Sequence, residues 1–195
     1  MRDGGAEALS SDEQLVRQIQ DGDEAAFDTL VRRYLSRSLR IARRFCRNEE
    51  DAVQETFLRV FTHIDKFDFR GRFSTWFFRI HTNVCLNHVR AFRRIQKFFL
   101  RPQHAAPESE WRQQLDGFAG ESDPHGEQEQ TELRRAIEKG LQKLPTPQRL
   151  VLILYDLEGF SQREIAQMLE IPEGTVMSRL YYARRAMQPF LREFR

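Results

Sequence analysis

Apolar side chains recur every three or four residues through most of this chain, which is the period of an α-helix with one buried face. The pattern predicts helices over about Glu24 to Arg47, Glu49 to His63, Ser74 to Lys97 and Glu132 to Leu144. No segment alternates apolar and polar residues between hairpin turns, as a half-buried strand would. We therefore expect an all-α fold.

The helical pattern stops over residues 99–131, which are rich in proline, glycine and acidic residues. Such a composition is typical of a tether and cannot bury enough apolar surface to form a core. We expect two small helical domains, 11–98 and 132–195, joined by this acidic flexible linker. Residues 1–10 are expected to be disordered.

Local signals mark where several helices begin and end. Ser11 to Gln14 and Ser161 to Glu164 have the form of capping boxes, and Asp21-Gly22-Asp23-Glu24 is a further start signal before a long helical segment. Ser74 can cap the helix that follows it, and Gly159 is placed to end the helix that begins at Thr146-Pro147.

The last two predicted helices form a helix-turn-helix pattern, with a short break before Pro172. Val176, Leu180, Ala183 and Met187 share the inner face of the second helix. Its outer face is polar and cationic, which suits the edges and phosphates of duplex DNA. It presents Ser178, Arg179, Tyr181, Tyr182, Arg184 and Arg185. The alternative is a solvated face on an ordinary helical hairpin.

Acidic residues are absent from Phe69 to Pro107, although the chain holds 29 of them. Aromatic and basic residues alternate from Phe67 to Phe73, a combination that fits stacking on unpaired bases and pairing with phosphates. The outward arc of the next helix is also free of acids, and it contains Trp76, Arg79, Asn83, Leu86, Asn87, Arg90, Arg93 and Arg94. The alternative is that these phenylalanines only fill a core and these arginines only solubilise the helix.

The predicted helix over residues 49–63 has a different outer face. Its inward residues are expected to be Val53, Phe57, Val60, Phe61 and Ile64, which leaves Asp51, Gln54, Glu55 and Leu58 outside. An exposed leucine among acids suggests a protein partner with basic residues, although a lone exposed leucine is also common on ordinary surfaces.

No enzyme signature appears: the chain has no Walker loop, no paired carboxylates for a metal and no Cys/His cluster. We expect no enzymatic activity, no cofactor and no metal, with His81 and His88 as packed histidines. Cys46 and Cys85 are expected to be buried thiols in a reducing cytoplasm. The chain shows no signal peptide and no membrane-spanning apolar run, so we expect a soluble cytoplasmic protein.

Three motifs, in this order, resemble those of extracytoplasmic-function sigma factors of bacterial RNA polymerase. They are Asp51-Ala52-Val53-Gln54-Glu55-Thr56-Phe57-Leu58, Phe69-Arg70-Gly71 through Trp76, and Ile171-Pro172-Glu173-Gly174-Thr175-Val176 followed by Ser178-Arg179-Leu180. The resemblance extends from about Ser11 to Phe194. It implies a sigma region 2 bundle and a sigma region 4 helix-turn-helix, and it implies transcription initiation of a stress or envelope-type regulon.

The resemblance also implies the partner of each surface. Core RNA polymerase, through the clamp helices of its largest subunit, would bind Asp51, Gln54, Glu55 and Leu58. The melted minus-ten element would contact Phe67, Phe69, Arg70, Arg72, Phe73, Trp76, Arg79, Asn83, Asn87, Arg90 and Arg94. The duplex minus-thirty-five element would contact Thr175, Met177, Ser178, Arg179, Tyr181, Tyr182, Arg184 and Arg185. The resemblance further implies that an anti-sigma factor restrains the chain, in some cases at the membrane.

Two departures from the family pattern limit what can be carried over. Met177 stands where many relatives carry Lys or Arg, and Asn87 stands where many carry Asp, so promoter preference cannot be borrowed. The rival hypothesis is a stand-alone helix-turn-helix regulator whose N-terminal domain senses a ligand. That rival needs a pocket, whereas the N-terminal part offers an acid-free surface of aromatic and arginine side chains.

Overall fold

The computed structural model describes residues 11–46, 48–99 and 127–194, and the side chains of these residues except 93–99, 127–130 and 193. The described elements are all helical, which confirms the predicted all-α class. The chain divides into two compact units, one formed by the residues up to Phe92 and the other chiefly by those that follow. The expected N-terminal segment 1–10 and linker residues 100–126 lie outside the described residues.

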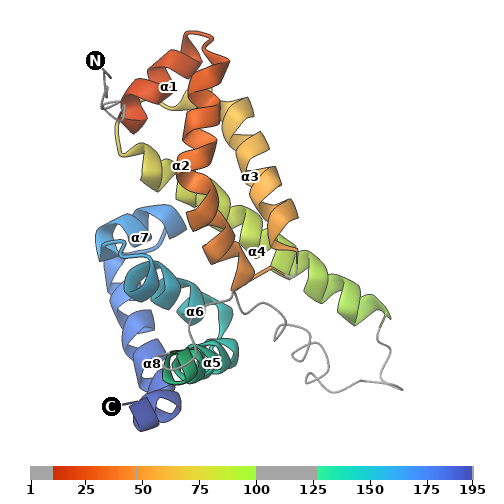
Figure 1. The fold of residues 1–195 in the computed structure, drawn as a ribbon, viewed down its shortest axis with the longest axis vertical. Helices are drawn as coiled ribbons and strands as arrows, with labels where there is room; N and C mark the ends of the chain where they lie inside the picture. Colours follow the sequence, from red (N-terminus) through yellow and green to blue (C-terminus); the bar gives the residue numbers. More distant parts are fainter. Residues whose placement is uncertain (1–10, 47, 100–126, 195) are drawn as a thin grey trace, which may run out of the picture. The chain divides into compact units, whose positions relative to one another are not determined.

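Four α-helices and one 3-10 turn build the N-terminal unit (Figure 1). They are α1 (Asp12–Gln20), α2 (Glu24–Arg43), α3 (Glu49–His63), η1 (Ile64–Lys66) and α4 (Phe73–Phe99). Helix α2 ends four residues before its predicted end. Helix α4 begins at Phe73, so Ser74 lies inside its first turn and is not the N-cap that the sequence predicted.

The N-terminal caps of α1 and α2 follow the sequence signals. Ser11 Oγ accepts from the Gln14 backbone amide at 3.2 Å, and Gln14 Oε1 accepts from the Ser11 amide at 2.8 Å, so the capping box is complete. Asp23 Oδ1 accepts from the Ala25 amide at 3.0 Å. These bonds satisfy amide groups that a helix cannot pair internally, and they fix where each helix starts.

Aromatic rings fill the core of the N-terminal unit. Tyr34 of α2 packs against Phe73, Phe77 and Phe78 of α4, with ring centroids 4.5–5.7 Å apart. All four side chains are buried. Tilted and edge-to-face ring pairs at these distances stabilise beyond their buried area, so α4 is firmly held against α2.

The C-terminal unit contains α5 (Glu127–Lys143), α6 (Thr146–Leu152), the π-helical turn η3 (Ile153–Leu157), α7 (Gln162–Leu169), α8 (Glu173–Leu191) and η4 (Arg192–Phe194). Helix α5 begins five residues before its predicted start. Gly159 adopts the left-handed conformation, φ 73°, that ends a helix, as predicted. The capping box between Ser161 and Glu164 is also formed.

Helices α5 and α8 pack closely at Gly140. A methyl group at Gly140 would lie 2.7 Å from the Met187 sulfur and 3.2 Å from the Phe190 ring, so glycine permits this approach. Leu141 and Leu144 are buried in the same unit. Among the described helices, none combines the length and the apolar character that crossing a membrane requires.

Candidate nucleic-acid interface

The loop between η1 and α4 surrounds a cluster of aromatic rings. The Phe67 ring lies 4.9 Å from Phe69, 5.5 Å from Phe73 and 5.6 Å from Trp76, measured between centroids. Phe67 and Phe73 are buried, whereas Phe69 and Trp76 are partly exposed. Phe67 and Phe73, which the sequence grouped with the DNA-contacting residues, therefore form the base of the loop. The rings accessible for stacking are Phe69 and Trp76.

The two arginines of this loop point to solvent. Arg70 pairs with Asp68 at 3.2 Å but keeps 89% of its side chain exposed, and Arg72 is exposed as well. An ion pair so exposed contributes little stability, so Arg70 can exchange Asp68 for another anion at low cost.

Four exposed polar residues line one face of α4. Arg79, Asn83, Asn87 and Arg90 follow one another at intervals of four, four and three residues, so they lie along the same side of the helix. Arg90 Nη1 donates to Asn87 Oδ1 at 3.3 Å. Arg94, predicted for the same face, lies where the structure does not describe side chains. The face joins cations to amides that both donate and accept hydrogen bonds.

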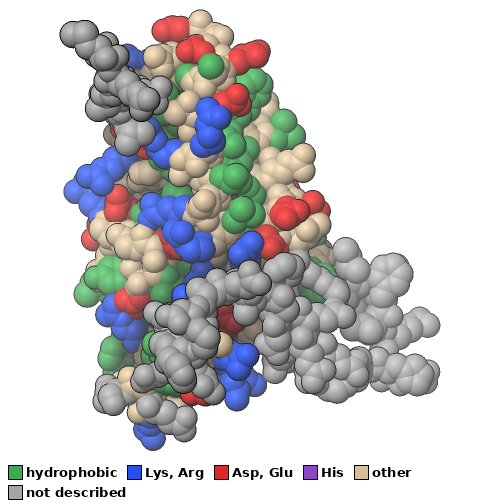
Figure 2. Space-filling view, in the orientation of Figure 1, with side chains coloured by type: hydrophobic (Ala, Val, Ile, Leu, Met, Phe, Trp, Pro, Cys, Tyr) green, Lys and Arg blue, Asp and Glu red, His purple; other side chains and the backbone are tan. Residues whose placement is uncertain are grey.

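The outer face of α3 has the composition that the sequence predicted. Asp51, Gln54 and Leu58 are exposed, Leu58 to 64%, and Glu55 is partly exposed. Phe61 is 50% exposed, so its predicted place on the inner face is wrong. Its ring packs edge-to-face on Phe27 of α2 at 5.0 Å. Three residues after Leu58, it extends the apolar part of this surface, and Figure 2 shows apolar side chains exposed along α2 and α3.

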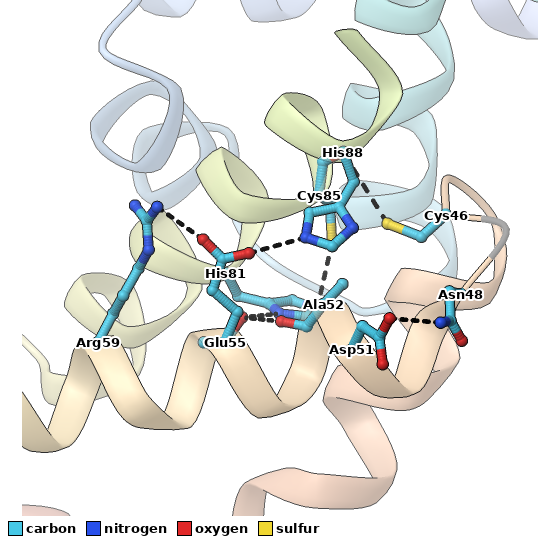
Figure 3. Close-up of polar contacts among 10 residues, drawn as sticks. Cys46, Asn48, Asp51, Ala52, Glu55, Arg59, His81, Cys85 and His88 are labelled. Carbon is cyan, nitrogen blue, oxygen red and sulfur yellow. Dashed lines mark hydrogen bonds and ion pairs between the residues drawn. The ribbon is translucent and has the colours of Figure 1, made fainter. Parts of the chain in front are cut away.

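Glu55 is held from both sides, as Figure 3 shows. His88 Nε2 of α4 donates to Glu55 Oε2 at 2.7 Å, and Arg59 Nη2 pairs with Glu55 Oε1 at 2.6 Å. The His88 bond and the Arg59 charge hold the pKa of the Glu55 carboxyl below its usual range, against a smaller opposing effect of burial. Asp51 accepts from the Asn48 side chain. The sequence placed Glu55 on this surface and predicted His88 as a packed histidine, whereas His88 is partly exposed and, together with Arg59, orients Glu55.

Behind this surface, His81 joins α4 to α2 and α3. The fully buried ring donates from Nε2 to the Ser38 carbonyl at 3.0 Å, and the Thr56 hydroxyl lies 3.0 Å from Nδ1. The predicted burial of Cys46 and Cys85 is confirmed. These groups serve the packing between the helices. No group of three or more His, Cys, Asp or Glu side chains among the described residues is arranged to hold a metal ion.

Helix α8 presents the face that its sequence predicted. Val176, Leu180, Ala183 and Met187 are buried, as expected. The opposite face is exposed, with Met177 at 56% and Tyr181 at 61%, and Thr175 and Arg179 are partly exposed. The exposed residues from the predicted set are Met177, Ser178, Tyr181, Tyr182, Arg184 and Arg185.

Arg184 is engaged within the C-terminal unit. Its Nε and Nη2 atoms donate to the two carboxylate oxygens of Asp156 in η3, at 3.0 and 2.5 Å. The guanidinium also lies 5.1 Å from the centre of the Tyr155 ring. Arg184, grouped with the DNA-contacting residues in the sequence, is thus a clamp between α8 and η3. Nothing in the local sequence pairs it with a residue 28 positions earlier.

Comparison with known proteins gives this arrangement its family. The model of Sigma-70 region 2 matches residues 30–95, and the model of Sigma-70 region 4 matches residues 134–187. The chain is 32% identical over 184 residues to the ECF RNA polymerase sigma factor SigW of Bacillus subtilis, covering 91% of this chain and 95% of that protein. The chain belongs to the ECF sigma factor family. This sigma factor functions in transcription initiation, and it binds core RNA polymerase and promoter DNA.

Other proteins are similar to this sigma factor over nearly its whole length. It is 33% identical to the RNA polymerase sigma-H factor of Pseudomonas aeruginosa, covering 93% of this chain and 96% of that protein. The solved structure of CnrH in complex with the cytosolic domain of CnrY is similar with a TM-score of 0.66 and 26% identity, over 94% of this chain and 99% of that chain. The region 2 match occupies the part where the rival regulator would need a sensing domain, so that alternative is not favoured.

Proposed function

We propose that this sigma factor binds its partners through three separate surfaces. The outer face of α3 binds core polymerase through Asp51, Gln54, Glu55 and Leu58. The loop before α4 and the exposed face of α4 hold the melted minus-ten element. The outer face of α8 reads the minus-thirty-five element as duplex. The domains extend over residues 11–98 and 132–195, with residues 99–131 between them. The ends of this connecting segment belong to helices, because α4 extends to Phe99 and α5 begins at Glu127.

One observation carries the assignment of the minus-ten surface. Arg79, Asn83, Asn87 and Arg90 form a continuous exposed face on a helix that contains no acidic residue, and two accessible rings, Phe69 in the preceding loop and Trp76 in the first turn of the helix, lie next to it. Single-stranded DNA is bound by stacking on aromatic rings and by cations along the backbone, and amides can pair with the edges of unpaired bases. The α4 face and its loop supply all three groups.

The exposed side chains of α8 favour duplex recognition. A helix of this kind enters the major groove, where arginine bonds to guanine and polar residues contact other bases. Arg185 and Ser178 are exposed on this face and are proposed to contact bases. Arg184 is paired with Asp156, so we assign it the role of fixing α8 in place for this contact.

The α3 surface favours a protein partner with basic groups. Its acids lie on the same helix as exposed Leu58 and Phe61, and apolar side chains flanked by charged ones are typical of a protein interface. Glu55 is already oriented by His88 and Arg59, so little freedom is lost when it binds.

We propose an anti-sigma factor as a further partner, which would restrain the chain and in some conditions hold it at a membrane. The support is that a structural relative, RpoE of Bartonella quintana, was solved in complex with the anti-sigma factor NepR. We also propose that the chain has no catalytic activity of its own and serves a regulon of the stress or envelope type.

Run-off transcription with purified core polymerase on a genomic promoter library tests this function. We expect specific transcripts only when the chain is present. Asn83→Ala should lower initiation from these promoters by about tenfold, because one base contact contributes about 1–3 kcal/mol. Arg32→Ala, on the exposed surface of α2, is the control and should initiate normally. Transcription that does not depend on the chain would refute the proposal.

A further inference from the structure

The loop between η1 and α4 is held by a helix far away in the sequence. The side-chain amide of Gln20, at the end of α1, donates hydrogen bonds to η1 and to the first residue of the loop that follows η1. One goes to the Ile64 carbonyl at 2.9 Å and the other to the Phe67 carbonyl at 3.1 Å. A single side chain thus fixes the backbone on both sides of the turn that enters the loop.

A second residue of α1 acts on the accessible ring. The Arg17 guanidinium lies over the face of Phe69, 4.4 Å from the ring centre, while the Phe67 ring meets Phe69 at 4.9 Å. Phe69 has a φ of 61°, in the left-handed region that bulky residues rarely adopt. A conformation of this kind persists only where the surroundings hold it, and Arg17 and Phe67 are those surroundings.

Helix α1 is a firm support for this task. Leu15, Val16 and Ile19 bury its inner face. At its other end, Asp12 accepts hydrogen bonds from the Tyr34 hydroxyl and from Arg33, both at 2.5 Å. Arg17 and Gln20 are three residues apart, so both reach the loop from the same side of the helix.

We propose that Arg17 and Gln20 are positioning residues for promoter melting. They hold the loop so that Phe69 and Trp76 stand ready to receive an unpaired base, and Arg17 adds a cation beside the stacked rings. This inference rests on the proposed function of the loop as the binding surface for the melted minus-ten strand. None of the residues proposed above to contact core polymerase or promoter DNA lies in α1. The inference gives α1 a role in holding single-stranded DNA.

The decisive variant is Gln20→Glu, which keeps the shape of the side chain and removes both donors, so that a carboxylate faces two carbonyl oxygens. Gln18→Glu is its matched control, because Gln18 is an exposed residue of the same helix. Arg17→Ala and Arg17→Lys form the second pair. The lysine should partly restore function, since an ammonium group also interacts favourably with the ring face.

Three measurements separate positioning from a general loss of structure. The first is the affinity of holoenzyme for a labelled non-template-strand oligonucleotide from a promoter found by run-off transcription. The second is the affinity of each variant for core polymerase. The third is the fluorescence of Trp76 in the free chain, made specific by Trp111→Phe because the chain has two tryptophans.

We expect Gln20→Glu to weaken oligonucleotide binding by about tenfold, as for the loss of two hydrogen bonds. It should shift the Trp76 emission and leave core affinity unchanged, and Gln18→Glu should match the parent protein in all three. Equal oligonucleotide affinities for Gln20→Glu and Gln18→Glu would overturn the inference. A loss of affinity for core polymerase in Gln20→Glu as large as its loss of oligonucleotide affinity would overturn it as well. If the parent holoenzyme itself fails to bind the strand, the proposed function of the loop falls, and the inference falls with it.

Discussion

A neutral histidine lies at the centre of the N-terminal unit. Burial lowers the pKa of His81 to about 4, because a charged ring would lose its hydration. Its Nε2 hydrogen bond to the Ser38 carbonyl opposes this shift only in part. Protonation of this buried ring therefore opposes folding.

We predict that this residue makes the protein less stable below neutral pH. As pH falls below 6.5, the ordinary pKa of histidine, the unfolded chain takes up a proton at His81, whereas the folded chain does so only near pH 4. The free energy of unfolding should therefore decrease by about 2 kcal/mol between about pH 7 and pH 5. Urea unfolding of the parent protein and of His81→Leu measures this. A pH dependence as steep in His81→Leu would contradict the assignment.

At the scale of helices, the ion pair between Arg184 of α8 and Asp156 of η3 helps to hold the outer face of α8 in position. Because Arg184 is paired with Asp156, we predict that the two residues are coupled in stability. A double-mutant cycle with Arg184→Ala and Asp156→Ala, measured by urea unfolding, should give a coupling free energy of about 0.5–1 kcal/mol. The value is small because the pair is partly exposed.

Arg185→Ala is the contrasting variant on the same helix. It should leave stability nearly unchanged and relax base preference in the minus-thirty-five element, at a cost of about 1–3 kcal/mol. The readout is promoter binding by holoenzyme on templates that differ only in that element. The opposite pattern, with base preference lost in Arg184→Ala, would make Arg184 a DNA contact after all.

The crossing of α5 and α8 leads to a further prediction. Gly140→Val should destabilise the C-terminal unit by about 1–3 kcal/mol, because the added methyls overlap the Met187 and Phe190 side chains. Met187→Ala in the same protein should restore part of this loss by removing the crowded thioether. Gly174→Ala is the control, since a methyl group at Gly174 would have no other atom within 4 Å. Thermal unfolding gives all three values.

The sequence predicted the elements better than it predicted the exposure of individual side chains. Helix starts at Ser11, Asp23 and Ser161 depend on bonds to residues at most three positions away, so local sequence is sufficient to find them. The burial of Phe67 and Phe73 was not predicted, because the short segment that leads into α4 has too few residues for a period to separate buried from exposed rings. The exposure of Phe61 and the pairing of Arg184 depend on Phe27 and Asp156, which only the tertiary fold brings near.

On the scale of the whole molecule, the surfaces proposed to bind the minus-ten and minus-thirty-five elements lie in different units of the chain. Two surfaces on separate units act together only when something fixes their separation, because this raises the effective concentration of DNA at the second surface. We predict that the free chain binds duplex promoter DNA at least about 100-fold more weakly than holoenzyme does, at the same salt concentration.

Titration of both forms against one promoter fragment at several salt concentrations checks this prediction. Affinity of holoenzyme should decrease steeply with salt, because bound arginines release counterions from the phosphates. A variant that loses one phosphate contact should reduce the slope by about one. Tight and specific duplex binding by the free chain would favour a regulator that acts without polymerase.

The two buried cysteines make this protein convenient for dye labelling. The Cys46 contact and burial both raise the pKa of the Cys85 thiol, so little reactive thiolate forms at neutral pH. The chain holds no third cysteine. Maleimide fluorophores should therefore react selectively with cysteines introduced at exposed positions such as Ser36 and Gln188, one in each unit. Energy transfer between two such dyes would report the separation of the units as the chain joins polymerase, with both native cysteines left in place.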